Sequence, residues 1–128
     1  LGDVYKRQVL DHPMENVIEA GGQILLAQRD DEIIGTVALM KMTDGGYELA
    51  KMSVAEQARG QGLGELLGQS AIQRATELGA SRVYLESNSV LQPALALYRK
   101  LGFEDIADKA SPYARCNVQM ELRLPSGG

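Results

Sequence analysis

Alternation of apolar and polar positions predicts three consecutive strands in the first half of the chain. Two runs rich in Ile, Leu and Val, at 23–29 and 33–40, flank a polar triplet at 30–32, which is typical of a hairpin. The turn-forming residues at 43–46, Thr-Asp-Gly-Gly, lead into a third run at 47–54. These segments together predict an antiparallel sheet.

In the second half of the chain the pattern first changes to helical spacing. Apolar or small residues between 63 and 78 repeat every three or four positions, and Gly79 follows in the C′ position of a helix. A strand is predicted at 82–86 and a second helix at 92–101. Residues 114–124 alternate again and predict the last strand.

The N-terminal region fits this pattern less well. Pro13, followed by spaced apolar residues, predicts a short helix that ends at the glycine pair before residue 23. Residues 1–8 show neither alternation nor helical spacing, so we expect them to be a non-native or disordered leader. The predicted organisation is therefore a single domain at 9–124 followed by a short tail at 125–128.

The order of the predicted elements determines the fold class. Three antiparallel strands are followed by helix, strand, helix and strand, so one β-α-β crossover joins an antiparallel run. We therefore expect the α+β class, with a mixed, mostly antiparallel sheet flanked by helices.

Composition narrows the range of functions. The net charge is −4 and Lys and Arg form no basic stripe, which argues against a nucleic-acid partner. No apolar run is long enough to span a membrane, and we expect a cytoplasmic protein. One cysteine, Cys116, and one histidine, His12, cannot form a disulfide framework or a typical metal site. We expect no metal.

Three glycines at alternate positions, Gly60, Gly62 and Gly64, connect the third strand to the first long helix. The first amides of a helix have no internal partner and lie at the positive end of its dipole, and glycines allow a ligand to approach them closely. This pattern predicts a phosphate or diphosphate site. Neither the dinucleotide-binding fingerprint nor the Gly-Lys-Ser/Thr phosphate loop fits the sequence.

Two motifs carry a resemblance to a known family. Arg-Gly-Gln-Gly-Leu-Gly at 59–64 matches the pattern Arg/Gln-x-x-Gly-x-Gly/Ala, and Leu-Tyr-Arg-Lys-Leu-Gly-Phe at 97–103 matches a second signature. From about residue 21 to 124 the chain resembles the GNAT superfamily of acyl-CoA-dependent N-acyltransferases. The resemblance implies the acyl-CoA N-acyltransferase fold.

The resemblance also implies acetyl-CoA as co-substrate. Amides of the glycine-rich loop would bind its diphosphate, main-chain groups at the end of the third strand would pair with the pantetheine arm, and an asparagine after the next strand would contact that arm. The implied cofactor-binding residues are Met52, Val54, Arg59, Gly60, Gln61, Gly62, Leu63, Gly64 and Asn88.

The catalytic groups are likewise implied by the family match. Tyr98 corresponds to the general acid that assists departure of the CoA thiolate, and Glu48 to a general base that deprotonates the acceptor. The alternative for Glu48 is an exposed strand residue, and Glu86 is the second candidate base. Tyr113 and Arg115 lie where the family builds acceptor pockets, and Arg115 is either an acceptor ligand or an outward-facing strand residue.

We therefore expect transfer of an acetyl group from acetyl-CoA to a primary amine of a small molecule or amino-acid-like acceptor. The alternatives are a non-catalytic acyl-CoA-binding or regulatory module and a fragment of a larger GNAT protein. Family members begin with a further strand and helices, so we expect the first strand and helix to be absent or displaced here. An edge strand exposed in this way favours a homodimer.

Overall fold

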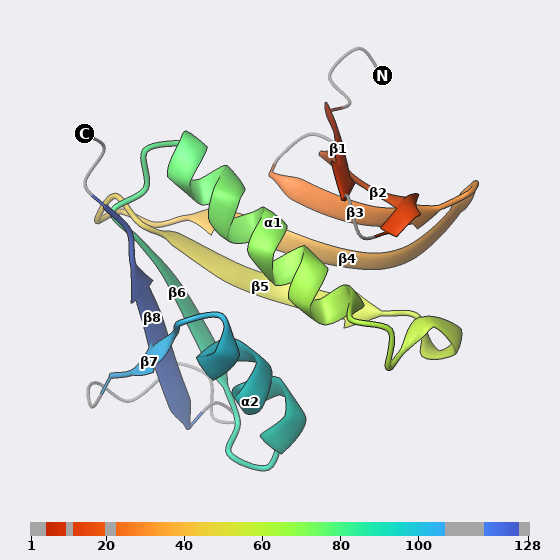
Figure 1. Cartoon of the computed structure of the whole chain (residues 1–128). Helices are drawn as coiled ribbons and strands as arrows, with labels where there is room; N and C mark the ends of the chain where they lie inside the picture. The colour runs from red at the N-terminus through yellow and green to blue at the C-terminus, as the bar shows by residue number, and fades with distance from the viewer. Residues whose placement is uncertain (1–4, 10–11, 20–22, 107–116, 126–128) are drawn as a thin grey trace.

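The computed structural model describes residues 5–9, 12–19, 23–106 and 117–125. They form one eight-stranded sheet, with helices α1 and α2 packed on one of its faces (Figure 1). All neighbouring strands in the described residues are antiparallel except β5 and β6, which are parallel and joined through α1. The predicted α+β class with a mixed, mostly antiparallel sheet is confirmed.

Across the sheet the strand order is β1-β2-β3-β4-β5-β6-β8-β7. The bounds of the strands are β1 Tyr5–Val9, β2 His12–Glu19, β3 Ile24–Arg29, β4 Glu32–Lys41, β5 Tyr47–Val54, β6 Arg82–Ser87, β7 Glu104–Asp105 and β8 Val118–Arg123. The predicted strands at 23–29, 33–40, 47–54 and 82–86 are confirmed, and the described part of the last one is β8.

The short helix predicted after Pro13 is wrong. His12–Glu19 is strand β2, which pairs with β1 on one side and β3 on the other. Ladder hydrogen bonds to two neighbouring strands outweigh a local preference for helix, which amounts to less than about 1 kcal/mol per residue. β1 includes four of the eight residues expected to be a leader. The domain boundaries at 9–124 and 125–128 remain predictions.

Both predicted helices are confirmed as α1, Leu63–Glu77, and α2, Gln92–Lys100, and a short 3-10 helix, η1, spans Glu56–Ala58. The buried face of α1 consists of the apolar and small residues that define the helical period, and Gly79 beyond its end has φ of 80°. The two helices approach closely. A Cβ at Gly68 would lie 2.5 Å from Leu101 Cδ1, and one at Gly64 would lie 3.1 Å from Leu97 Cδ2.

A β-bulge interrupts the pairing of β4 with β5. Ala38 lies opposite Ala50 and Thr36 opposite Ser53, so two residues of β5 face one residue of β4. Lys51, one of the two, has φ of 56°. A bulge bends its strand and increases the local twist. This one lies in the half of β5 that diverges from β6.

Candidate active site

Backbone amides at the start of α1 form the first component of the site. Gly62 is the N-cap with φ of 81°, no side chain caps the helix, and the amide of Leu66 makes the bond to the Gly62 carbonyl, at 3.0 Å. The amides of residues 63–65 therefore precede the first helical hydrogen bond and point out of the helix end. A Cβ at Gly60 or Gly62 would meet no atom within 4 Å, so the space beside these residues is open to a ligand.

Side chains of the loop before α1 bind the neighbouring strands. The Arg59 Nε donates a hydrogen bond to the Val54 carbonyl at 3.4 Å. These two residues, both predicted to bind the cofactor, therefore also contact each other. Gln61 accepts a hydrogen bond from Arg29 Nη2 at 2.5 Å and donates one to the Gln57 carbonyl at 3.4 Å. These contacts hold the glycine-rich loop against the end of β3.

A gap between β5 and β6 is the second component. Their parallel pairing consists of Tyr47 with Val83 and Glu48 with Tyr84, and beyond Glu48 the two strands diverge (Figure 1). Within the described ranges no strand pairs with the main-chain groups on that edge of β5. Met52 and Val54, the residues predicted to pair with pantetheine, lie in this diverging half.

Tyr98 lies on α2, on the face of the sheet that the helices cover. Its ring packs edge-to-face on Phe103, with the ring centroids 6.1 Å apart. In the described part of the chain its hydroxyl has no hydrogen-bond partner, and burial raises the pKa of the phenol. A phenol with a raised pKa stays protonated at neutral pH, as a general acid must.

Glu48 and Glu86 lie on the opposite face of the sheet. In β6, Val83, Leu85 and Ser87 are buried under the helices, so the alternate residues, including Tyr84 and Glu86, face the other way. Glu48 is half-buried, and its pKa is raised, first by desolvation and then by the negative charge of Glu86. This environment favours the predicted general base over an exposed strand residue.

The other residues predicted to belong to the site are Asn88, Tyr113 and Arg115. The Asn88 Oδ1 accepts a hydrogen bond from the Val90 amide at 3.0 Å, so this side chain shapes the turn before α2. Tyr113 and Arg115 lie outside the described residues. The sequence patterns did not single out Tyr84, whose hydroxyl donates a hydrogen bond to Glu86 Oε2 at 2.6 Å. Its position two residues before Glu86 places both side chains on one face of the strand.

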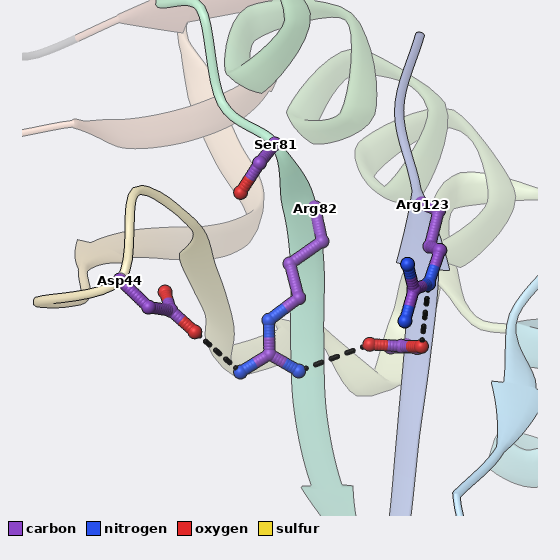
Figure 2. A pocket seen from close by; sticks show the side chains of 5 residues that line it. Asp44, Ser81, Arg82 and Arg123 are labelled. Carbon is purple, nitrogen blue, oxygen red and sulfur yellow. Dashed lines mark hydrogen bonds and ion pairs between the residues drawn. The ribbon is translucent and has the colours of Figure 1, made fainter. Parts of the chain in front are cut away.

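A pocket of about 250 Å³ lies on the same face as Glu48, at the end of the sheet where β5 and β6 are still paired. Figure 2 shows Arg82 between two carboxylates, with Arg123 beyond one of them. Its guanidinium binds Asp44 Oδ2 at 2.8 Å and Glu121 Oε1 at 3.0 Å. Arg123 binds Glu121 Oε2 at 3.1 Å. Because opposite charges already pair here, we interpret this pocket as an ion-pair network that joins the β4–β5 turn to β6 and β8.

Replacing Arg82 with Met should lower the free energy of unfolding by about 1–2 kcal/mol, because it removes two charge-assisted hydrogen bonds and keeps the aliphatic stem. The control is Arg123→Met, whose side chain is 84% exposed and which should cost no more than about 0.5 kcal/mol. Urea unfolding of the three proteins measures both values. Equal stability of the Arg82 variant and the parent would refute this role.

The same comparison has a defined pH dependence. The Gly46 amide, followed by Arg82, lowers the pKa of Asp44. Desolvation alone would raise the pKa of Glu121, but the hydrogen bonds and charges of Arg123 and Arg82 together lower it. A carboxylate with a lowered pKa stabilises the fold above its unfolded pKa, and this contribution is lost as the pH falls through the folded pKa. The difference between parent and Arg82→Met should therefore shrink in acid.

Among the residues that the structure describes, no three His, Cys, Asp or Glu side chains gather as metal ligands. Within the same residues, neither helix has the length and apolar character that a bilayer span requires.

A helix start whose first amides precede the helical hydrogen bonds, next to diverging strands with a phenol on one face and a carboxylate on the other, is the arrangement expected of one class of protein. This class is the acyltransferases that use a nucleotide-linked thioester. The comparisons with known proteins support the same class.

A model described as the acetyltransferase (GNAT) family matches residues 3–103. The uncharacterized N-acetyltransferase YjgM of Escherichia coli is 32% identical over 120 residues, 90% of this chain and 72% of the relative. N-acetyltransferase 8F1 of Rattus norvegicus is 30% identical over 95 residues, 70% of this chain and 43% of that protein. A Bacillus subtilis acetyltransferase solved with CoA has a TM-score of 0.70 and 24% identity, over 88% of this chain and 78% of that one.

The chain belongs to the GNAT acetyltransferase family and is an acetyl-CoA-dependent acyltransferase. The finer assignments, namely the acceptor and the roles of individual site residues, are proposals.

Proposed function

We propose that this protein transfers the acetyl group of acetyl-CoA to a primary amine of a small molecule or amino-acid-like acceptor. The observation that carries the proposal is the divergence of β5 from β6 directly after Glu48 and Tyr84. At this point the strands separate, so residues from the two faces of the sheet lie on either side of it. The α1 amides and Tyr98 lie toward the helix-covered face, and Glu48 and Glu86 lie on the other.

Each face then has its own substrate. The open space beside Gly60 and Gly62 suits the diphosphate of the acyl donor, since, among the described residues, none beyond the chain neighbours has an atom within 4 Å of where a side chain would begin. The thioester supplies an activated acyl carbon when the donor is bound. The acceptor amine approaches from the face that carries the carboxylates, so the two substrates meet in the gap without crossing.

The residues present can perform the required proton transfers. The acceptor arrives as an ammonium ion, and the Glu48 carboxylate takes one proton from it. The free amine attacks the thioester carbon, so a C–N bond forms and the C–S bond breaks. Tyr98 gives its phenolic proton to the departing thiolate. The second amine proton, released as the amide forms, restores the phenol through solvent.

Holding the reactants together is expected to supply much of the rate. Well-oriented reactants can contribute roughly 7–11 kcal/mol to lowering a barrier. The loop contacts of Arg59 and Gln61 and the packing of α1 on α2 keep the donor-binding groups in one geometry. This rigidity favours catalysis over simple storage of acyl-CoA.

The proposal is tested by release of free CoA thiol from acetyl-CoA in the presence of a panel of small amines, amino acids and short peptides. We expect release that depends on a small amine. Calorimetric binding of CoA without amine-dependent release from any member of the panel would instead identify a non-catalytic acyl-CoA-binding module. Thiol release only with peptides would show that the acceptor is a peptide and not a small amine.

Replacing Tyr98 with Phe should lower kcat by about 10²-fold with little change in the KM for acetyl-CoA, because a general acid contributes to the chemical step. The substitution removes only the hydroxyl and retains the ring that packs on Phe103. Tyr47→Phe, at a partly buried tyrosine of β5 that packs on the core, is the matched control and should leave kcat unchanged. An undiminished kcat in Tyr98→Phe would remove Tyr98 from the mechanism.

A further inference from the structure

Tyr84 and Glu86 form a fixed pair on the open face of β6. The Tyr84 hydroxyl donates to Glu86 Oε2 at 2.6 Å, a short distance typical of a hydrogen bond to a carboxylate. The tyrosine ring is itself held, because the Arg82 guanidinium lies 5.1 Å from its centroid. Arg82 is in turn bound by Asp44 and Glu121. The Glu86 carboxylate therefore has a rigid support that extends to the end of the sheet.

The position of this pair relative to the gap indicates its function. Glu48 and Tyr84 are the last residues that pair β5 with β6. Glu86 is the next residue of β6 on the same face, so it lies on the diverging limb. The two carboxylates thus flank the point where the strands separate, with the Tyr84 hydroxyl hydrogen-bonded to the one on the far side.

The charged groups around this point favour a cation. β6 contributes Tyr84, Glu86 and Arg82, and β8 contributes Glu121 and Gln119 opposite Tyr84 and Glu86. β4 contributes the uncharged Met40 opposite Glu48. The guanidinium of Arg82 is bound by the carboxylates of Asp44 and Glu121 (Figure 2). In the described part of the chain the charge of Arg82 is thus balanced by two carboxylates, and the neighbouring charge that acts on Glu48 is the negative one of Glu86.

We propose that Tyr84 is a positioning residue whose hydroxyl fixes Glu86 as the anionic anchor for the acceptor's ammonium group, while Glu48 takes the proton. The inference rests on the proposed function and assigns separate roles to the two carboxylates. One N–H of the ammonium donates to Glu86, which keeps its charge, and another N–H gives its proton to Glu48. The acceptor is then recognised as a cationic primary amine.

Steady-state kinetics with n-butylamine, or with the best amine of the panel, test this division. Tyr84→Phe and Glu86→Gln should each raise the KM for the amine at least about tenfold and leave the KM for acetyl-CoA unchanged. Because Tyr84 acts through Glu86, Tyr84→Phe should have no further effect in the Glu86→Gln background. Equal effects of Tyr84→Phe in both backgrounds would show a merely structural role and overturn the proposal.

The pH profile of kcat/KM gives a second readout. Loss of the Glu86 charge should move the acidic limb, which reports Glu48, to lower pH in Glu86→Gln. An unmoved limb together with an unchanged amine KM would contradict the inference even if transfer itself is normal.

A binding measurement separates this inference from the proposed function. Carboxyl carbon NMR of the CoA-loaded protein, titrated with n-butylammonium, should shift the Glu86 signal in the parent, and the same shift in Tyr84→Phe should need at least about tenfold more ammonium. This result would support the anchor without any turnover. If the protein transfers acetyl groups but the Glu86 signal does not shift with the ammonium ion, the proposed function stands and the role of Glu86 as an anchor is wrong.

Discussion

Glu48→Gln is expected to lower kcat by about 10²–10⁴-fold, the usual contribution of a general base. The substitution keeps the size of the side chain and its place beside Tyr84, so binding of CoA should not change. In the parent, kcat/KM should fall in acid with a limb above the ordinary range for a glutamate, because desolvation and then the charge of Glu86 raise the pKa of Glu48. In the variant this limb should disappear. Thiol release across a pH series measures both.

The same substitution should stabilise the fold at neutral pH. A carboxyl group whose folded pKa is raised favours the fold fully below its unfolded pKa and loses that contribution as the pH rises through the folded pKa. Ionised Glu48 is therefore a cost at pH 7, which glutamine does not have. The gain in stability should vanish in acid. Such opposition between stability and activity is common at catalytic groups.

The control for this pair of effects is Glu104→Gln, which removes a carboxylate from an exposed position of β7. It should leave both kcat and the unfolding midpoint in urea near those of the parent. If Glu48→Gln retained full kcat and behaved like this control, Glu48 would be an ordinary strand residue, and Glu86 would become the candidate base.

Gly62→Val is expected to weaken binding of CoA by at least about 10–100-fold. A valine at φ of 81° is strained, and relief of that strain would turn the first amides of α1 away from the ligand. Its side chain would also occupy the open space beside the loop. Loss of one amide-to-phosphate hydrogen bond costs about 1.5–3 kcal/mol, which gives the stated range. Isothermal titration calorimetry with CoA measures it.

The chain offers a matched control at the other end of the same helix. Gly79 has φ of 80°, and a Cβ there would also meet no atom within 4 Å. Gly79→Val should therefore carry a similar backbone strain and a similar loss of thermal stability, while CoA affinity stays unchanged. An equal loss of affinity in both variants would mean that general destabilisation, and not the phosphate loop, explains the effect. An unchanged affinity in Gly62→Val would remove the loop from the site.

Much of the fold could be predicted because local signals and tertiary contacts agree. The hairpin at β3 and β4, the helical face of α1 and the glycine that ends it all satisfy both local preference and burial. The glycine-rich loop was also predictable, because positive φ at Gly60 and Gly62 leaves few alternatives to glycine. Here residue type alone indicates the backbone conformation.

Other features depend on long-range pairing that local pattern does not encode. The helix expected after Pro13 is the strand β2, because β1 and β3 pair with it. The bulge at Lys51 has no glycine to mark it, although its φ is 56°. The link from Tyr84 to Glu86 has local spacing, but its importance appears only when β5 brings Glu48 beside it. Register between distant strands decided each of these cases.

The near-contact of α1 with α2 has a consequence for donor choice. Gly68 lies against Leu101 and Gly64 against Leu97, so the helix whose first amides we propose to bind the phosphates cannot shift independently of the helix that carries Tyr98. The distance between the proposed phosphate site and the Tyr98 hydroxyl is therefore set by packed side chains and not by a flexible loop. A thioester whose arm is shorter or longer than pantetheine would dock its charged end and still present its sulfur at the wrong place.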